Sequence, residues 1–363
     1  FDLTAKRIIS WLSNHQLTYE DSDKDYRLTF DHMIQKQANH LLNEINDSKE
    51  TENKIISCAA IILTGLAYKK EKKYLDNGLN QLKNMIKYLF DNQGFPKSRN
   101  IKQQIFYLKY FILIREWFKE AQVEIPEHLD ETIYYLGQAY AYFWQNNEVN
   151  LLFNGNNNSN NQEFDNYLKR FGYKFKNDSI DYCGYTILQN KKMCIAMDTG
   201  SSPESKYSED YQSGTLSFEI ISNGKKLISN CGYHNKENKK LNQLSKSSAT
   251  HSTLVIDDNS SCKFFKKNGV WMLKTGLKIT EKKYIFEKNY WKITAAHDGY
   301  LKKYNSIHER QIEIFPEKFR FIGTDKIIKK KNNLNIKFEI RFHLEPGIKL
   351  MKTKDNKSIL IEL

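Results

Sequence analysis

Proline and cysteine are both scarce in this sequence, and long apolar runs are missing. Only 5 of the 363 residues are proline, and the 5 cysteines are an odd number with no C-x-x-C spacing. This pattern gives no disulfide framework and argues against a zinc ribbon or a redox motif. No apolar stretch reaches the roughly 18 residues that a membrane-spanning helix needs. We therefore expect buried free thiols and no membrane span in this chain.

Several motifs with a well-understood chemistry are also missing. The chain contains no G-x-x-x-x-G-K-[ST], no G-x-G-x-x-G, no H-E-x-x-H and no G-x-S-x-G. These motifs are typical of P-loop proteins, dinucleotide-binding proteins, zinc proteases and α/β-hydrolases, respectively. Proteins of those four classes are therefore disfavoured.

The charge of the chain is strongly one-sided. Its formal net charge is +13, which favours a polyanionic partner such as nucleic acid, anionic lipid or acidic polysaccharide. A composition rich in Lys, Asn and Ile is also what an AT-rich genome imposes, so both explanations stay open. The first residue is Phe1 and no charged-then-apolar leader follows it. We therefore expect the native N-terminus, and any signal peptide with it, to be missing.

Apolar periodicity divides the chain into two halves. Apolar residues recur at helical spacing up to about residue 147 and predict antiparallel amphipathic helices. The predicted helices cover residues 3–17, 25–46, 53–68, 73–90, 102–121 and 128–145. An Asn-rich stretch at 154–162 contains no apolar side chain and is the expected boundary.

From about residue 182 the period changes to two, which is typical of strands. Residues 215–221 and 225–231 flank Asn223 and Gly224, which predicts a hairpin with a tight turn. Further strands are predicted at 252–257, 270–277, 284–286, 290–296, 309–315, 335–344 and 348–351, with no intervening helices. The last residues are apolar and strand-like, so we expect this half to be truncated. We expect an α+β multidomain protein with helices over 1–155, a linker and loop over 156–178 and an antiparallel β-sandwich over 179–363.

Short polar stretches with chemical potential follow one another in a fixed order. The helical half carries SRN at 98–100 and FNG at 153–155. The β half carries D-x-G at 198–200, LSFE at 216–219, NCG at 230–232, HSTL at 251–254, HDGY at 297–300, HER at 308–310 and RFHL at 341–344. In this order the stretches resemble the heparinase II/III-like family, over nearly the whole chain and most sharply over 194–346.

The resemblance implies an α/α toroid, incomplete at its start, followed by a β-sandwich. It also implies β-elimination in a uronate-containing acidic glycan, which makes an acidic polysaccharide the expected partner. A base must take the proton next to the uronate carboxylate, an acid must protonate the departing oxygen, and a donor must neutralise the carboxylate.

The resemblance also suggests which residues serve these roles. The expected catalytic residues are Tyr300, His251, His297 and Arg99. Arg99 and Asn100 are the expected carboxylate neutralisers and project from the helical half. Tyrosine has an ordinary pKa of about 10, so a nearby cation would be needed for Tyr300 to act as base. The expected substrate-binding residues are Asn100, Gln212, Tyr211, His308 and Arg310. A structural role for a histidine between strands is the alternative for His297 and His308, and also for His251.

The sequence departs from the family at one place. Many members carry His where this chain has Gln212, and Asp near Asn230; with His251 these would complete a structural zinc site. The set in this chain is Gln212, Asn230 and His251, and amide oxygens are poor zinc ligands. The departure argues against zinc, the one cofactor that the resemblance implies.

Three functions remain open at this point. The first is a polysaccharide lyase, and the second is a non-catalytic carbohydrate-binding or envelope-polysaccharide assembly protein on the same scaffold. The third, a nucleic-acid binder, is supported by the net charge alone, and we expect no nucleic acid as partner. The resemblance implies a bacterial periplasm or cell envelope. The sequence leaves the glycan, the cleavage mode and the oligomeric state undetermined.

Overall fold

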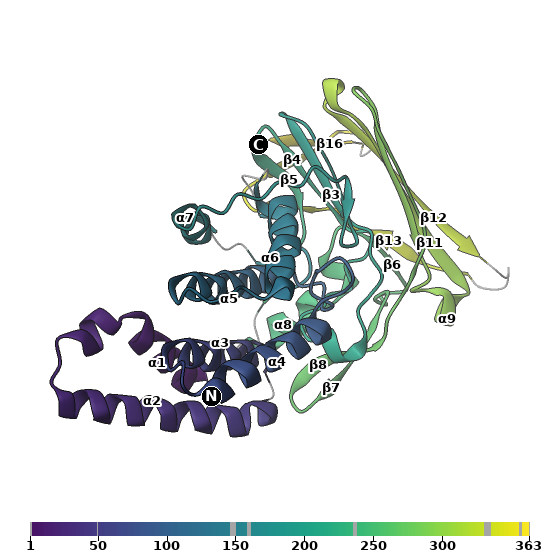
Figure 1. Ribbon diagram of the computed structural model, residues 1–363. Coiled ribbons are helices and arrows are strands. Elements are labelled where there is room, and N and C mark those ends of the chain that lie inside the picture. The colour runs from purple at the N-terminus through teal and green to yellow at the C-terminus, as the bar shows by residue number, and fades with distance from the viewer. Residues whose placement is uncertain are drawn as a thin grey trace. The chain divides into compact units, whose positions relative to one another are not determined.

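The structure is a computed structural model, and it describes residues 2–48, 50–145, 150–157, 161–234, 238–329, 335–355 and 358–362 (Figure 1). The chain divides into two compact units, described separately below. The first unit contains residues 1–95 and 104–138, and the second contains residues 96–103 and 139–363. Helices α5 and α6 each cross from one unit to the other.

Helices build the first unit. Their bounds are α1 Asp2–Ser13, α2 Lys24–Glu44, α3 Thr51–Ala67, α4 Lys72–Leu89, α5 Ile101–Glu120 and α6 Glu127–Tyr140. Each agrees with a predicted helix within a few residues. After α6 the chain continues as a π-helix over Ala141–Gln145, which reaches the predicted end of the last helix. Helix α3 is buried all round from Ile55 to Leu66, so it forms the centre of the unit. Helix α4 packs closely on it because Gly65 leaves room for the Leu75 backbone and Gly78 for Ile62.

The second unit consists mainly of antiparallel strands. The strand bounds are β1 Asp181–Tyr182, β2 Tyr185–Gln189, β3 Met193–Asp198, β4 Phe218–Ser222, β5 Lys225–Ser229, β6 Leu254–Ile256, β7 Lys263–Lys267, β8 Val270–Thr275, β9 Ile279–Phe286, β10 Trp291–His297, β11 Ser306–Phe315, β12 Arg320–Lys329, β13 Phe338–Ile340, β14 His343–Leu344, β15 Lys349–Lys352 and β16 Ile359–Glu362. One sheet has the order β1-β2-β3-β4-β5-β14 and another the order β12-β11-β10-β9. The strand pairs β13–β6, β15–β16 and β7–β8 form two-stranded sheets.

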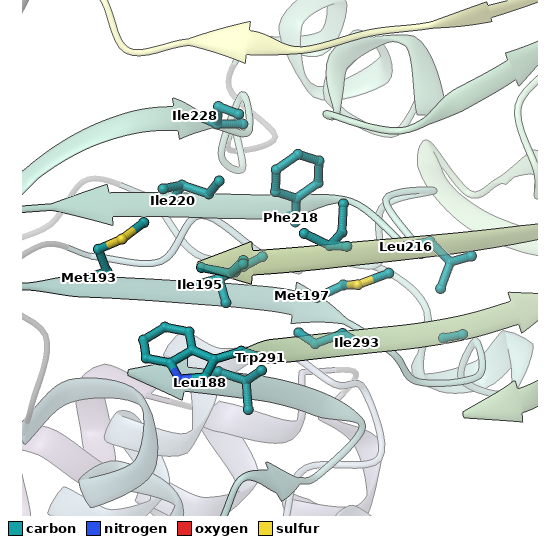
Figure 2. Packing of buried hydrophobic residues seen from close by; sticks show 13 residues of the cluster. Leu188, Met193, Ile195, Met197, Leu216, Phe218, Ile220, Ile228, Trp291 and Ile293 are labelled. Atoms are coloured by element: carbon teal, nitrogen blue, oxygen red, sulfur yellow. The ribbon is translucent and has the colours of Figure 1, made fainter. Parts of the chain in front are cut away.

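These two larger sheets share one apolar core. Strands β2 to β5 contribute Met193, Ile195 and Phe218 among others, and strands β10 and β11 contribute Trp291 and Ile312. Figure 2 shows the labelled side chains of this cluster gathered between the strands that carry them. Because side chains alternate along a strand, the apolar members occupy one face of each strand. The core thereby fixes the register of the strands that carry the candidate site.

The predicted hairpin is confirmed. Strands β4 and β5 pair antiparallel and are joined by Asn223 and Gly224, which have φ values of 49° and 74°. Positive φ at both central residues is what a tight two-residue hairpin turn requires, and Asn-Gly satisfies it at little cost.

Two parts of the prediction were wrong. The β half was expected without helices, but α8 (Lys239–Ser245) and α9 (Leu301–Tyr304) lie between its strands. The stretch expected to be linker and loop contains α7 (Gln162–Arg170), which buries Phe164 and Leu168 at helical spacing. Residues 158–160 of the Asn-rich stretch lie outside the described residues. Strands β7 and β12 were not predicted. Within the described residues, no helix combines the length and apolarity that crossing a membrane requires.

Candidate functional site

The Arg99 side chain contacts several residues of the second unit. Its guanidinium donates to the Asp198 carboxylate at 2.8 Å, to the Gly184 carbonyl at 2.9 Å and to the Gly200 carbonyl at 3.2 Å. It also lies over the Tyr185 ring, 4.6 Å from the centroid. The expectation that Arg99 projects from the helical half is wrong, because residues 96–103 belong to the second unit. Its expected contact with a substrate carboxylate stays a prediction, since these donors serve protein acceptors here.

The D-x-G and FNG stretches have a clear role in holding Arg99. Asp198 accepts from Arg99 and also from the Asn154 side chain, at 3.0 Å. A Cβ on Gly200 would lie 2.4 Å from the Arg99 guanidinium, so glycine leaves the room that the arginine occupies. Asn154 also donates to the Tyr185 hydroxyl at 2.9 Å and accepts from the backbone of Gln212 at 3.2 Å. These stretches therefore form one buried polar network around a paired charge.

Asn100 begins helix α5 and connects it to the second unit. Its side-chain oxygen accepts from the backbone N–H groups of Lys102 and Gln103, at 2.8 and 3.1 Å, which is the geometry of a helix N-cap. Its amide nitrogen donates to Asp210 at 2.9 Å. The other oxygen of Asp210 accepts from the Tyr233 hydroxyl at 2.7 Å. Asn100 is thus a capping residue as well as an expected substrate ligand.

The three residues considered for zinc do not fit that ion. His251 Nε2 lies 3.0 Å from the Ser245 carbonyl oxygen, and Gln212 Nε2 donates to the same oxygen at 2.8 Å and to the Gly232 carbonyl at 2.9 Å. Asn230 instead contacts Glu219 through both its backbone and its side-chain nitrogen. The amide oxygens, which would have to bind the ion, accept from backbone N–H groups instead: Gln212 from Gly155 at 3.4 Å and Asn230 from Ser252 at 3.1 Å. No set of three or more His, Cys, Asp or Glu side chains in the described part of the chain is arranged for a metal.

A second buried network crosses the four-stranded sheet. His297 on β10 pairs in register with His308 on β11, and Arg310 pairs with Asp325 on β12. Residues 308 and 310 share the buried face of β11 because they lie two apart on a strand. His308 Nε2 lies 2.6 Å from Asp325, and the Arg310 guanidinium donates to both oxygens of that carboxylate, at 2.8 and 3.0 Å.

The hydrogen bonds of this network fix the tautomers of both histidines. The Gly299 N–H donates to His297 Nδ1 at 3.1 Å, so the proton of a neutral His297 is on Nε2. His297 Nε2 lies 3.3 Å from His308 Nδ1 and donates to it. His308 then carries its proton on Nε2 and donates to Asp325. The chain of donors therefore ends on a carboxylate that two guanidinium contacts keep ionised.

Burial acts on the pKa values in this region. Desolvation, with help from His308 and Arg310, lowers the pKa of His297 well below its ordinary value, and desolvation also lowers that of His308. Burial lowers the pKa of His251 to about 4. The Asp325 carboxyl is opposed by desolvation, yet His308 and Arg310 bring its pKa down to about 2. At neutral pH the histidines are therefore neutral and Asp325 is charged.

The two expected tyrosines are buried with their hydroxyls engaged. Tyr300 donates to the Leu254 carbonyl at 2.9 Å and packs with Tyr304 in a small apolar cluster. The Tyr211 hydroxyl pairs with Thr215 at 3.0 Å. Burial raises the pKa of both hydroxyls above the ordinary range, which opposes the phenolate that a base would need.

The structure brings the expected residues together in part. Arg99, Asn154, Gln212 and His251 form one connected set through Asp198 and the Ser245 carbonyl. His297, His308 and Arg310 form another set, connected through Asp325. Arg310 also donates to the carbonyl of Ser252, the residue that follows His251, at 2.6 Å. Tyr300 lies beside His297, with ring centroids 5.7 Å apart. Their expected catalytic and binding roles stay predictions.

Asp325 and Asp210 were missed by sequence reasoning. Asp325 lies on β12, a strand that was not predicted because Gly323 and Asp325 interrupt its apolar pattern. Asp210 precedes the Tyr211-Gln212 pair that was singled out, and nothing in its spacing marks it as the partner of both Asn100 and Tyr233.

The second half of the chain is similar in sequence to a known protein family. The description "Heparinase II/III-like, C-terminal" matches residues 175–363. The chain belongs to this heparinase II/III-like family. No curated protein sequence matches the chain.

Solved structures extend the likeness beyond the matched domain. A heparinase III structure with methylated lysines is 15% identical, with a TM-score of 0.79, and the likeness covers 99% of this chain and 57% of that one. A heparan sulfate lyase HepC from Pedobacter heparinus is 13% identical, with a TM-score of 0.74, covering 98% of this chain and 57% of that one. Another heparinase III is 16% identical, with a TM-score of 0.73 and coverage of 99% and 60%. These structures therefore share a mixed helical and antiparallel-sheet fold with this chain, which spans less than two thirds of their length.

Proposed function

We propose that this protein is a polysaccharide lyase that cleaves a uronate-containing acidic glycan by β-elimination. In this proposal the helices form part of an α/α toroid, and the two larger sheets form the β-sandwich. The observation that carries it is the likeness to heparinase III and heparan sulfate lyase structures over 98–99% of this chain. The net charge of +13 suits an acidic polymer.

The buried networks suit such an enzyme as its supporting framework. Arg99, His251, His297 and Tyr300 are all at least nine-tenths buried. In this arrangement they hold the strands and loops that present other groups to the glycan. Of the two expected neutralisers, Asn100 has a half-buried partner. It donates to Asp210, which also accepts from the half-buried Tyr233.

A second function has a specific observation in its favour. The acid, base and cation expected for β-elimination make hydrogen bonds to protein atoms, as is typical of structural residues. A non-catalytic carbohydrate-binding or envelope-polysaccharide assembly protein would need no free acid or base. In either case a bacterial periplasm or cell envelope is the compartment that we propose, on the resemblance alone.

Ultraviolet absorbance separates the two functions. The protein is incubated with a glycosaminoglycan, alginate and polygalacturonate, while a neutral glycan serves as control. β-Elimination leaves a conjugated double bond at the new non-reducing end, so a lyase increases the absorbance with at least one acidic glycan. Glycan binding without any increase would instead support the binding protein.

A further inference from the structure

The hairpin of strands β7 and β8 carries charge of one sign only (Figure 1). Residues 263–275 contain the lysines Lys263, Lys266, Lys267 and Lys274 and no Asp or Glu. All of these lysines are exposed. Within the described part of the chain, no carboxylate forms an ion pair with any of them. Because no ion pair compensates this positive charge, the hairpin attracts anionic partners.

Aromatic side chains lie beside these lysines. Lys266 and Trp271 are register partners across the hairpin, and the Lys266 ammonium lies 6.0 Å from the centroid of the Trp271 ring. Trp271 is partly exposed. On the opposite face, the exposed Phe265 and Lys267 lie two residues apart and point the same way. A cation next to an aromatic ring suits an acidic sugar, which has an apolar ring face and a negative group.

The base of the hairpin is anchored to the rest of the second unit. The Leu273 N–H donates to the Ser208 hydroxyl at 2.7 Å, and the Leu273 carbonyl accepts from the Ser205 hydroxyl at 2.7 Å. Leu273 also packs with Tyr211 in a small apolar cluster, and Phe264 lies against that cluster. The hairpin is therefore held in place next to Tyr211, an expected substrate-binding residue.

Lys246 connects the hairpin to the polar side chains around Asn100. Its ammonium lies 5.2 Å from the centroid of the Phe264 ring and 6.0 Å from that of the Tyr233 ring. The Tyr233 hydroxyl donates to one oxygen of Asp210 at 2.7 Å, and the other oxygen accepts from Asn100 at 2.9 Å. Direct contacts therefore run from Asn100, the expected carboxylate neutraliser, to the base of the hairpin.

We propose that the β7–β8 hairpin is a binding surface for an acidic glycan, in which a sugar ring packs on Trp271 and its negative group pairs with Lys266. Lys263, Lys267 and Lys274 add positive charge along the same polymer. This inference rests on the proposed function, because both candidate functions need an acidic glycan as partner. Nucleic acid is the less suitable polyanion, since residues 263–275 contain no arginine, the side chain best suited to phosphate recognition.

A matched pair of lysine variants tests the charge. Lys266→Gln/Lys267→Gln removes two charges from the hairpin, and the control Lys288→Gln/Lys318→Gln removes two exposed charges from turns of the four-stranded sheet. Binding is measured by biolayer interferometry on immobilised heparan sulfate and polygalacturonate. We expect the hairpin variant to bind about tenfold more weakly and with a less steep salt dependence, because fewer counterions are released. The control should bind within about twofold of the wild type.

Trp271→Leu tests the aromatic contact. Leucine keeps an apolar side chain on the hairpin but removes the ring, so we expect glycan binding to weaken about fivefold or more. Tyr284→Leu is the control, because Tyr284 is also an exposed aromatic residue on a strand, β9, but lies outside the hairpin. Its binding should equal that of the wild type. Circular dichroism of each variant shows whether the fold is retained.

The outcomes distinguish this inference from the function on which it rests. Wild-type protein that neither binds nor cleaves any acidic glycan overturns both. Wild-type binding or cleavage that both hairpin variants retain at the level of their controls overturns the inference alone and leaves the proposed function standing. Single-stranded DNA that binds as tightly as heparan sulfate, through the same two lysines, overturns the assignment of the surface to a glycan.

Discussion

The buried Gln212 side chain forms its hydrogen bonds with protein atoms. Gln212 is fully buried, and its amide nitrogen serves two carbonyl oxygens, of Gly232 and Ser245. An amide at this position provides two donors, which a carboxylate cannot. This explains the residue that departs from the family pattern, because its donors close a network that needs no metal.

Gln212→Glu tests that explanation. The new carboxylate would face two carbonyl oxygens in a buried site, so we expect the free energy of unfolding to fall by about 3 kcal/mol or more. The exposed Gln243→Glu on α8 is the control and should change stability little. Urea unfolding followed by circular dichroism provides the measurement. Equal stability of the two variants would mean that Gln212 does not hold the network.

The buried histidines predict a loss of stability in mild acid. The pKa values of His251, His297 and His308 are lowered in the folded protein, whereas the unfolded chain binds protons near pH 6.5. The stability is therefore complete above that pH and falls as the pH drops from there toward the folded pKa values, by up to about 1.4 kcal/mol per pH unit for each histidine.

Thermal unfolding at a series of pH values measures this effect. The wild-type midpoint should fall steadily below about pH 6.5. His297→Gln should make the dependence shallower, whereas the exposed His32→Gln should leave its slope unchanged. A midpoint that stays constant as the pH falls to about 5 would contradict neutral buried histidines.

At the scale of elements, glycines at the turns decide how closely segments approach. Gly155 has a φ of 75° and leaves room for Asn100, while Gly172 has a φ of 74° and has no neighbour within 4 Å. The two positions carry the same backbone strain for alanine but differ in the clash. They are therefore a matched pair for the turn that supports the cap of α5.

Gly155→Ala should destabilise the protein more than Gly172→Ala. Both substitutions place a Cβ in the left-handed region, which costs about 1–2 kcal/mol. Only Gly155→Ala also displaces Asn100, so we expect an additional loss of about 1–3 kcal/mol. The difference between the two urea midpoints isolates the clash. Equal losses would mean that Asn100 moves aside without cost.

Much of the element structure could be predicted from the sequence, and the reasons are local. The helical spacing between residues 2 and 140 and the Asn223-Gly224 turn depend on a few sequence neighbours. They could therefore be predicted without knowledge of tertiary contacts. Strand β12 was missed because Asp325 and Gly323 interrupt its apolar pattern. That interruption is explained by the pairing of Asp325 with Arg310, a contact that only the tertiary register creates.

The site was harder to predict because a sequence motif does not show whether its side chains are buried or exposed. The SRN, HSTL, HDGY and HER stretches do lie within connected networks. However, their polar atoms contact the protein, which spacing alone cannot reveal. Asp210 and Tyr233 are joined to Asn100 across more than 100 residues of sequence, and no local signal marks that contact.

At the scale of the whole molecule, the fold belongs to the heparinase II/III-like family and extends the likeness over both units. The identity to the solved lyases is 13–16%, so the fold is shared while individual side chains have largely changed. The residues that would perform the proposed reaction therefore have to be identified in this chain itself. Elimination and hydrolysis of the same glycosidic bond give chemically different products, so the products identify the reaction.

The most direct measurement is mass spectrometry of the oligosaccharides released from an acidic glycan in oxygen-18-labelled water. Elimination breaks the glycosidic bond without adding water, so the account predicts unsaturated, unlabelled new non-reducing ends in the products. Products that carry one labelled oxygen for each bond broken would identify hydrolysis. An intact glycan that stays bound to the protein would identify the non-catalytic alternative, and either result would contradict the lyase.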